Sequence, residues 1–310
     1  MSRRGWLLLV TVGVIWGIPY LLIKIAVTDV SPVMVVFVRT ALGALLLLPF
    51  ALRGGGLRVL RGRWRAVLGF AVLEIVLPWI LLSHAEVTLS SSTTGLLVAT
   101  VPIAAVVLGR LVGDRRPVAA IRWIGLLVGL GGVALLLGPG AAGGDPWAVA
   151  QVLLAALGYA SAPIIADRAL RDVPAIPLTA TCLGLTALGY APVVLLTGPH
   201  PWPPVDAVLA LAGLGALCTA LAFVLFFQLI VEVGAARSTL VAYLNPVVAV
   251  ALGALVLDEA ITAGVLAATA LILLGSAAAS RRPREATQQD VPPTPDEAVT
   301  ADDAARVTPT

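Results

Sequence analysis

The chain has 310 residues, of which 59% are hydrophobic and only 12% are charged, and its formal net charge is +3. A water-soluble domain carries about 25% charged residues, and the mean hydropathy here is +1.01. These values exclude an ordinary soluble domain and predict a protein whose solvent is the lipid bilayer. The small positive charge fits membrane topology and predicts no nucleic-acid-binding surface.

Long apolar runs follow one another along almost the whole chain. They lie at about 6–27, 32–50, 64–82, 92–112, 119–137, 147–166, 178–196, 206–231, 236–257 and 261–280. Each is close to the roughly 20 residues that a helix needs to cross about 30 Å of hydrocarbon. We therefore predict an all-α polytopic membrane protein with ten transmembrane helices. The tail over 283–310 is rich in Pro, Thr, Asp and Ala, and we predict that it is disordered.

The second half of the chain repeats the first at an offset of about 144 residues. The offset aligns Pro19 with Pro163, Lys24 with Arg168, Pro102 with Pro246, Gly109 with Gly253, Asp114 with Asp258 and Gly131 with Gly275. We predict a first five-helix repeat over 1–143 and a second over 144–282. Because five crossings separate equivalent helices, the second repeat is inverted relative to the first, which is a common build of secondary transporters.

Basic residues separate cleanly when the ten runs are placed as alternating crossings. Of the 20 Lys and Arg residues, 18 lie in the connections or at the ends of the runs on a single side. The connections on the other side carry acids instead: Asp29, Glu86, Asp145, Asp206, Asp258 and Glu259. The positive-inside rule then places both termini in the cytoplasm, with 53–63 and 283–310 inside and 198–204 outside.

Four segments carry a resemblance to a known family. They are VGVIWGIPYLLIK at 12–24, FVRTALGALLLLP at 37–49, SSSTTGLLVATVPIAAVVLG at 90–109 and AYLNPVVAVALGALVLDEAIT at 242–262. With ten crossings in about 300 residues, the chain resembles the EamA-type branch of the drug/metabolite transporter superfamily. The resemblance implies a bacterial inner-membrane transporter, specifically an exporter of a small metabolite, amino acid or drug-like compound. The two halves differ in one respect, since Leu183 stands where the first has Arg39.

Three charged residues, Glu74, Arg39 and Lys24, lie within the predicted crossings away from the inner ends where the other basic residues gather. Charges at membrane depth are costly and are functional candidates. Glu74 lies about 15 Å from the inner end of its crossing, and Arg39 lies about 10 Å from the outer end of its own. Glu74 can carry a proton during transport or form a structural ion pair with Arg39. Lys24, near an outer end, either contacts substrate or extends its amine toward the interface.

Prolines at corresponding places of both halves predict helix breaks near a central binding site. These are Pro19 with Pro163, and Pro102 with Pro246. The alternative is that the prolines only kink their helices and that nearby Ser and Thr residues allow close packing. The predicted polar and aromatic lining near the breaks consists of Trp16, Tyr20, Trp79, Ser92, Thr93, Thr94, Tyr159, Ser161, Ser238, Tyr243 and Asn245.

Two functional classes fit these features: a secondary transporter, and a channel or intramembrane enzyme. The sequence holds no H-E-x-x-H, G-x-S-x-G or Walker A motif, so we predict no enzyme and no cofactor. His84 and His200 have no metal-ligand spacing, so no metal site is predicted. The expected partners are a small-molecule substrate, lipid and protons. The sequence leaves open whether the protein is a monomer or a homodimer.

Overall fold

The computed structural model describes residues 1–111, 120–136, 145–197 and 202–279, and within these ranges the chain forms helices and no strand. Seven helical segments are long and apolar enough to cross a membrane, and three shorter apolar helices complete the set. This confirms the predicted all-α membrane protein with ten crossings. The tail over 283–310 lies outside the described residues.

The first five crossings are the following. The first two are α1 (Arg3–Asp29) and α2 (Pro32–Leu52), followed by a short 3-10 helix η1 (Arg53–Leu60). The third crossing is built from α3 (Trp64–Ala71), a π-helical segment η2 (Val72–Val76) and α4 (Leu77–Thr88). The fourth is α5 (Ser91–Val98) with α6 (Val101–Leu111), and the fifth is α7 (Ala120–Leu136).

The last five crossings follow a similar plan. They begin with α8 (Pro146–Ala169) and α9 (Ala175–Leu196). The eighth crossing is α10 (Val205–Ala212), a second π-helical segment η3 (Gly213–Leu221) and α11 (Ala222–Val233). The ninth is α12 (Ala235–Ser238) with α13 (Val241–Val256), and the tenth is α14 (Ala263–Ala279).

Short polar residues start several of these helices. The side chains of Ser2, Ser31, Ser90 and Asp145 each accept a hydrogen bond from a backbone N–H of the first turn. Such caps satisfy donors that have no partner within the helix. Proline follows the cap in α2 and α8, where its missing N–H does no harm. The sequence thus fixes where these crossings begin.

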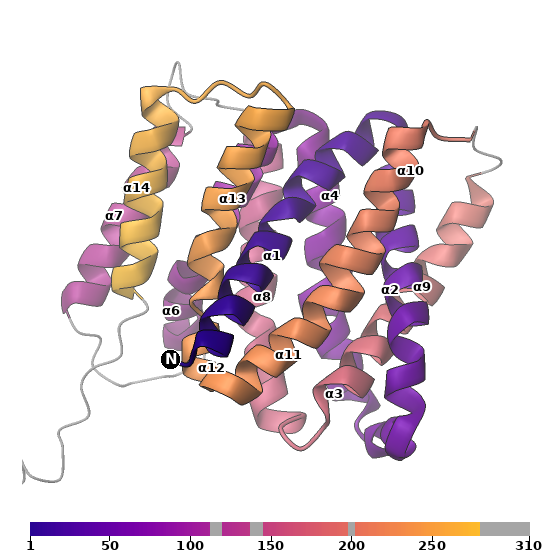
Figure 1. Cartoon of the computed structure of the whole chain (residues 1–310). Coiled ribbons are helices and arrows are strands. Elements are labelled where there is room, and N and C mark those ends of the chain that lie inside the picture. The colour runs from indigo at the N-terminus through magenta and orange to yellow at the C-terminus, as the bar shows by residue number, and fades with distance from the viewer. Residues whose placement is uncertain (112–119, 137–144, 198–201, 280–310) are drawn as a thin grey trace, which may run out of the picture. The chain divides into compact units, whose positions relative to one another are not determined.

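The chain alternates in direction through the bundle, so the N-terminus and the end of α14 lie at one end, and the connection from α13 to α14 lies at the other (Figure 1). We call the first of these the inner end and the second the outer end, after the predicted topology. The orientation itself stays a prediction.

Contacts between distant crossings hold the bundle together. α2 packs on α9, α1 on α13, and α7 on α14. A Cβ on Gly125 of α7 would lie 2.6 Å from the backbone nitrogen of Ala279 in α14. Small residues therefore let these two helices approach closely, as is typical in membranes, where lipid supplies no hydrophobic force between helices.

The structure corrects the prediction that four prolines interrupt their helices. Pro19, Pro163 and Pro246 lie inside α1, α8 and α13, which continue through them. A proline removes only one N–H, and the packing of neighbouring helices can hold the remaining turns in place. Only Pro102 lies beside a break, at 99–100, where the hydrogen bonds tighten to Ala99 N–Leu96 O and Thr100 N–Leu97 O, each 3.1 Å.

The unpredicted irregularity is the pair of π-helical segments. Shifting η2 by the 144-residue offset places it within η3. A π turn widens the helix by one residue and is frequent at functional sites. The third and eighth crossings therefore share a local distortion that the proline pattern does not mark.

Candidate substrate site around Arg39

Arg39 lies deep in the bundle, with 7% of its surface exposed. Its Nε donates a hydrogen bond of 3.0 Å to Thr219 Oγ1, across 180 residues of sequence. Its guanidinium carbon lies 3.6 Å from the centre of the Trp79 ring. A guanidinium over an indole face gains a cation–π attraction that strengthens when water is excluded. Side chains from α2, α4 and η3 thus converge on one buried cation.

A glycine one turn after Arg39 brings η3 close to α2. A Cβ on Gly43 would lie 2.7 Å from Thr219 Cγ2, so any larger residue would push the segments apart. Thr219 Oγ1 also donates to Leu214 O at 2.8 Å within η3. The hydroxyl therefore accepts from Arg39 and donates to its own helix, which fixes its orientation.

Arg39 forms no ion pair with a carboxylate in the described chain, and the buried Glu86 carboxylate attracts it only through space. The ion pairs among the described residues are Arg4–Glu232, Arg63–Asp172 and Arg171–Asp167, and all of them lie near helix ends. The two terminal nitrogens of Arg39 make no hydrogen bond with the described residues. A buried charge without a partner is expensive, so this arrangement suits a site whose partner arrives with the ligand.

Glu74 does not form the ion pair with Arg39 that we considered from the sequence. It is half-buried on η2 and makes no hydrogen bond or ion pair with the described residues. Ile75 and Trp79 instead face the cluster that contains Leu183. Adjacent helical residues point to different sides, so η2 presents Ile75, and not Glu74, to the apolar cluster that contains Leu183.

Two helices of the second half hold the η2 segment that carries Glu74. A Cβ on Gly158 of α8 would lie 2.7 Å from Leu73 O, so this helix approaches the backbone of η2 directly. Tyr190 of α9 donates its hydroxyl to Val76 O at 3.1 Å. Tyr159, next to Gly158, packs against the cluster that includes Trp79. Glu74 is therefore embedded where the two halves meet.

Lys24 binds backbone carbonyls. Its Nζ donates to Glu86 O at 2.8 Å and to Leu89 O at 2.9 Å, at the C-terminus of α4. The last carbonyls of a helix lack partners within it and carry partial negative charge, so a cation is stabilising there. Lys24 thus joins α1 to the outer end of α4.

Glu86 corrects the sequence interpretation, which placed it in an outer connection and took Glu74 as the only acid within a crossing. It lies inside α4 with 0% exposure, and neither carboxylate oxygen has a hydrogen-bond partner in the described chain. The apolar run was expected to end at 82, but the helix continues through SHAEVT to residue 88. Hydropathy alone did not predict that this last part of α4 is helical and buried.

The outer ends of the fourth and ninth crossings are tied together by Glu259. Its carboxylate accepts from the backbone N–H of Ser91 at 2.7 Å and of Ser92 at 3.0 Å, and from the Ser92 hydroxyl. A carboxylate at a helix N-terminus satisfies free donors and the helix dipole. Ser91 Oγ is buried there without a hydrogen-bond partner in the described chain.

The remaining predicted lining residues hold helices together or satisfy their own backbone. Trp16 packs on Phe223 and Phe226 of α11, with ring centroids 5.7 and 4.6 Å away. With its amide nitrogen turned toward α1, Asn245 donates to Gly13 O at 3.1 Å. Tyr243 donates to Ser276 O at 3.4 Å.

Four other residues of the predicted lining remain. The Thr94 hydroxyl donates to Ser90 O at 3.1 Å, and the Ser161 hydroxyl donates to Leu157 O at 2.6 Å. Both acceptors lie four residues before the donor. Ser238 is buried in α12, and Tyr20 is buried against Gly95. Of the predicted set, Trp79 contacts Arg39 directly, and Tyr159 packs against the same cluster as Trp79. Thr219 was missed because a threonine in an apolar run gives no distinctive signal.

The searched part of the chain contains no group of three or more His, Cys, Asp and Glu residues able to hold a metal ion. His200 lies outside the described residues.

Comparison with known proteins agrees with this architecture. The model of the EamA-like transporter family matches residues 3–138 and again 146–281. The chain belongs to the EamA-like transporter family. It is therefore an integral membrane protein of a transporter family, whose partners are a small-molecule substrate and the lipid bilayer.

Similar proteins extend over most of the chain. An uncharacterized inner membrane transporter of Escherichia coli K12, YedA, is 29% identical over 246 residues, covering 77% of this chain and 78% of that protein. An uncharacterized transporter of Archaeoglobus fulgidus is 22% identical, covering 88% and 97%. A protein solved by crystallography covers 90% of this chain and 98% of its own at a TM-score of 0.64 and 23% identity, a similarity that shows the fold alone.

Proposed function

We propose that this protein is a secondary active transporter that exports a small metabolite, amino acid or drug-like compound by alternating access. The observation that carries this proposal is the buried, carboxylate-free guanidinium of Arg39, held by Thr219 and Trp79 between the two halves. The family and the ten crossings support it. The substrate site lies where the halves meet, as expected for inverted repeats.

The chemistry of Arg39 favours a substrate with an acidic group. Its Nε is occupied by Thr219, which leaves two terminal NH₂ groups. A guanidinium presents these donors as a planar fork that matches a carboxylate or phosphate. The Trp79 ring fixes the plane of the guanidinium. We therefore propose that Arg39 binds an anionic group of the substrate.

Alternating access would use the repeats over 1–143 and 144–282 as two bodies that rock about the site. The π-helical segments η2 and η3 lie at equivalent places in these repeats. Both contact the seam between the halves, through Gly158 and Tyr190 at η2 and through Gly43 at η3. We propose that these segments take up the change in helix packing as the halves move.

Proton coupling is proposed at Glu74. Its carboxyl group lies within a crossing and has no hydrogen-bond or charge partner among the described residues. Burial without a partner disfavours the charged form, and an aqueous opening favours it. Alternation between a closed and an open surrounding would therefore carry one proton per cycle.

Counterflow in proteoliposomes tests this function. Vesicles loaded with one compound from a metabolite panel should take up a radiolabelled trace of the same compound, and acidic compounds should outperform their neutral amides. Arg39→Gln should abolish the difference between acid and amide.

Conductive flux without counterflow would support a channel instead. Comparing inside-out with right-side-out vesicles under a pH gradient tests the direction of transport.

Orientation has its own test. A membrane-impermeant thiol reagent added outside cells should modify a cysteine placed at position 200 and spare one at position 56. The expected pattern follows from the 18 basic residues on one predicted side. The side chains at both positions lie outside what the structure describes. The reverse labelling pattern would overturn the predicted topology.

A further inference from the structure

Lys24 and Arg168 occupy equivalent positions in the two repeats but have different surroundings. Lys24 donates two hydrogen bonds to the carbonyls of Glu86 and Leu89. Arg168, near the inner end of α8, is exposed and makes no hydrogen bond or ion pair with the described residues. Lys24 therefore caps the end of a helix, whereas Arg168 caps none in the described chain.

The target of Lys24 also has an equivalent in the second half. The offset maps Glu86 and Leu89 of the third crossing onto Ile230 and Val233 of the eighth. α4 ends at Thr88, and α11 ends at Val233. The two hydrogen bonds of Lys24 go to backbone oxygens, which every residue offers, although the Glu86 carboxylate adds an attraction that Ile230 would not supply. The last turn of α11 therefore offers Arg168 the same kind of acceptor.

Helix packing shows the same asymmetry. α1 packs on α4, whereas no comparable contact joins α8 and α11 in the described chain. At the outer end, α5 packs on α13, where a Cβ on Gly95 would lie 2.5 Å from Ala249 Cβ. No comparable contact joins α6 to α12 or α13 among the described helices. Among these equivalent helix pairs, those at the outer end are in contact, and those at the inner end lack a comparable contact in the described chain. The halves are still joined at the inner end by the Arg4–Glu232 and Arg63–Asp172 pairs.

We infer that Lys24 and Arg168 are alternating gate residues, each of which closes its own end of the transporter by capping a helix. In the state described here, Lys24 caps α4 and closes the outer end. In the opposite state, Lys24 leaves α4, α8 moves against α11, and Arg168 caps the carbonyls of 230–233. This inference rests on the proposed alternating access and adds the residues that stabilise each state.

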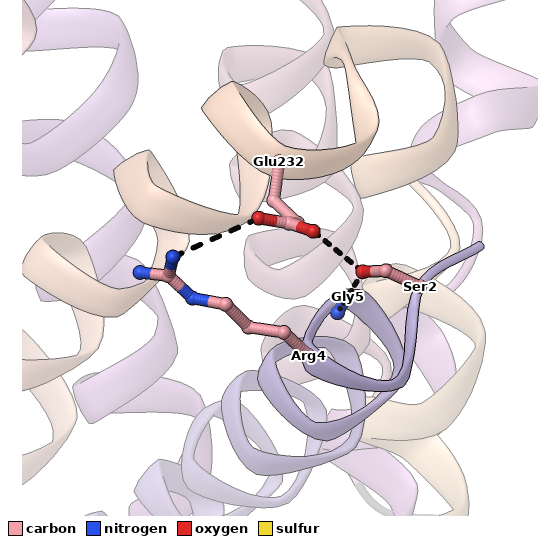
Figure 2. Close-up of polar contacts among 4 residues, drawn as sticks. All are labelled: Ser2, Arg4, Gly5 and Glu232. Carbon is pink, nitrogen blue, oxygen red and sulfur yellow. Dashed lines mark hydrogen bonds and ion pairs between the residues drawn. The ribbon is translucent and has the colours of Figure 1, made fainter.

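The inner end already contains a charged contact that Arg168 would join. Figure 2 shows Glu232, in the last turn of α11, accepting a hydrogen bond of 2.5 Å from Ser2 Oγ and lying 3.9 Å from Arg4. An acid in the last turn opposes the helix dipole, so a second cation is favourable there. Arg4 is largely exposed in this pair, which leaves room for Arg168 beside the same helix end.

The test measures opening of the outer end with a cysteine at position 91. Ser91 is buried, and its hydroxyl has no hydrogen-bond partner in the described chain, so Ser91→Cys loses no hydrogen bond. Cys182 and Cys218 are replaced by Ala, and the rate of maleimide labelling is measured in nanodiscs, where the reagent reaches both ends. Slow labelling reports a closed outer end.

Three substitutions then decide the inference. Lys24→Met should raise the rate at which the cysteine at position 91 is labelled about tenfold, because it destabilises the state in which the outer end is closed. Adding Arg168→Gln to Lys24→Met should lower that rate by a similar factor, because it destabilises the state in which the inner end is closed. Arg171→Gln is the matched control, because Arg171 lies in the same connection and pairs with Asp167 at 2.6 Å, and it should change nothing. Lys24→Arg and Arg168→Lys should behave like the unchanged chain.

An Arg168→Gln variant that labels at the same rate as its parent, or faster, would overturn the inference. Arg168 lies near the opposite end of the membrane from Ser91, so a local disturbance cannot produce the expected slowing. If Lys24→Met does not fold, the Arg168→Gln substitution alone, in the protein that carries the cysteine at position 91, still tests the inference. This variant should fold, because Arg168 is exposed. Loss of counterflow in the parent protein would instead refute the transport function, so the two failures are distinguishable.

Discussion

The two halves share a framework but differ in the chemistry attached to it. Shifted by the 144-residue offset, Trp79 coincides with Phe223, and η2 falls within η3. Arg39, however, coincides with Leu183, whose side chain is fully buried in the apolar cluster around Ile75.

The other polar members of the site are one-sided as well. Glu74 coincides with Cys218, which is buried, and Thr219 coincides with Ile75. The equivalents of Arg39 and Thr219, Leu183 and Ile75, lie instead in one apolar cluster. In the proposed function, repetition supplies two distorted crossings that move against each other, while a single asymmetric set of polar groups binds the ligand. A transporter needs symmetry for its motion but only one site for its substrate.

The largest expected effect comes from making the first half resemble the second. Arg39→Leu should reduce counterflow of an acidic substrate at least about 30-fold, because losing one partner of a buried charged contact costs about 2–5 kcal/mol. The protein should still fold, since Arg39 has no carboxylate partner to leave unpaired in the described chain.

The matched control for this change is Leu183→Met at the equivalent position. A volume-conserving apolar substitution in a buried cluster should leave counterflow near its starting rate. If Arg39→Leu transports acidic compounds as well as the control does, the cation is not part of the substrate site.

The next effect separates coupling from binding. Glu74→Gln keeps the shape of the side chain and removes its titration, so uptake driven by a pH gradient should be abolished while exchange at equal pH stays largely intact. Cys218→Ser, at the equivalent position of η3, should retain both activities. Gradient-driven uptake in Glu74→Gln that equals the unchanged protein's would refute proton coupling there, and failure to insert would indicate a structural role.

A smaller effect is expected from the hydroxyl that orients Arg39. Thr219→Val keeps the shape and removes the 3.0 Å hydrogen bond. A hydrogen bond to a charged group contributes about 1.5–3 kcal/mol, so the apparent affinity for an acidic substrate should fall about tenfold or more. Thr186→Val is the control, because Thr186 is equally buried and bonds only to Cys182 O at 2.8 Å. Equal affinities in the two variants would contradict the role of Thr219.

The smallest effect concerns stability rather than transport. Gly158→Ala would place a Cβ 2.7 Å from Leu73 O, and relieving such overpacking costs about 1–3 kcal/mol. The melting temperature of the purified protein should fall. Gly189→Ala in α9 has nothing within 4 Å of the added carbon and should be neutral or slightly stabilising. Equal melting temperatures would show that α8 and η2 are not tightly packed.

The sequence by itself determined the number of crossings, most of their limits and the family. Ten apolar runs matched ten crossings, because crossing a bilayer is a local property of length and hydropathy. Capping residues such as Ser31 and Asp145 mark helix starts for the same local reason. Arg39 and Glu74 stood out because a charge within an apolar run is visible without a structure.

Only the tertiary structure decided which groups meet. It paired Arg39 with Thr219 and not with Glu74, it engaged Lys24 with the end of α4, and it buried Glu86. The physical reason is that a membrane helix is apolar on nearly every face, so hydrophobic periodicity does not fix its rotation. Close contacts at glycines such as Gly43 and Gly158 set that rotation instead, and they join residues more than 80 positions apart in the chain.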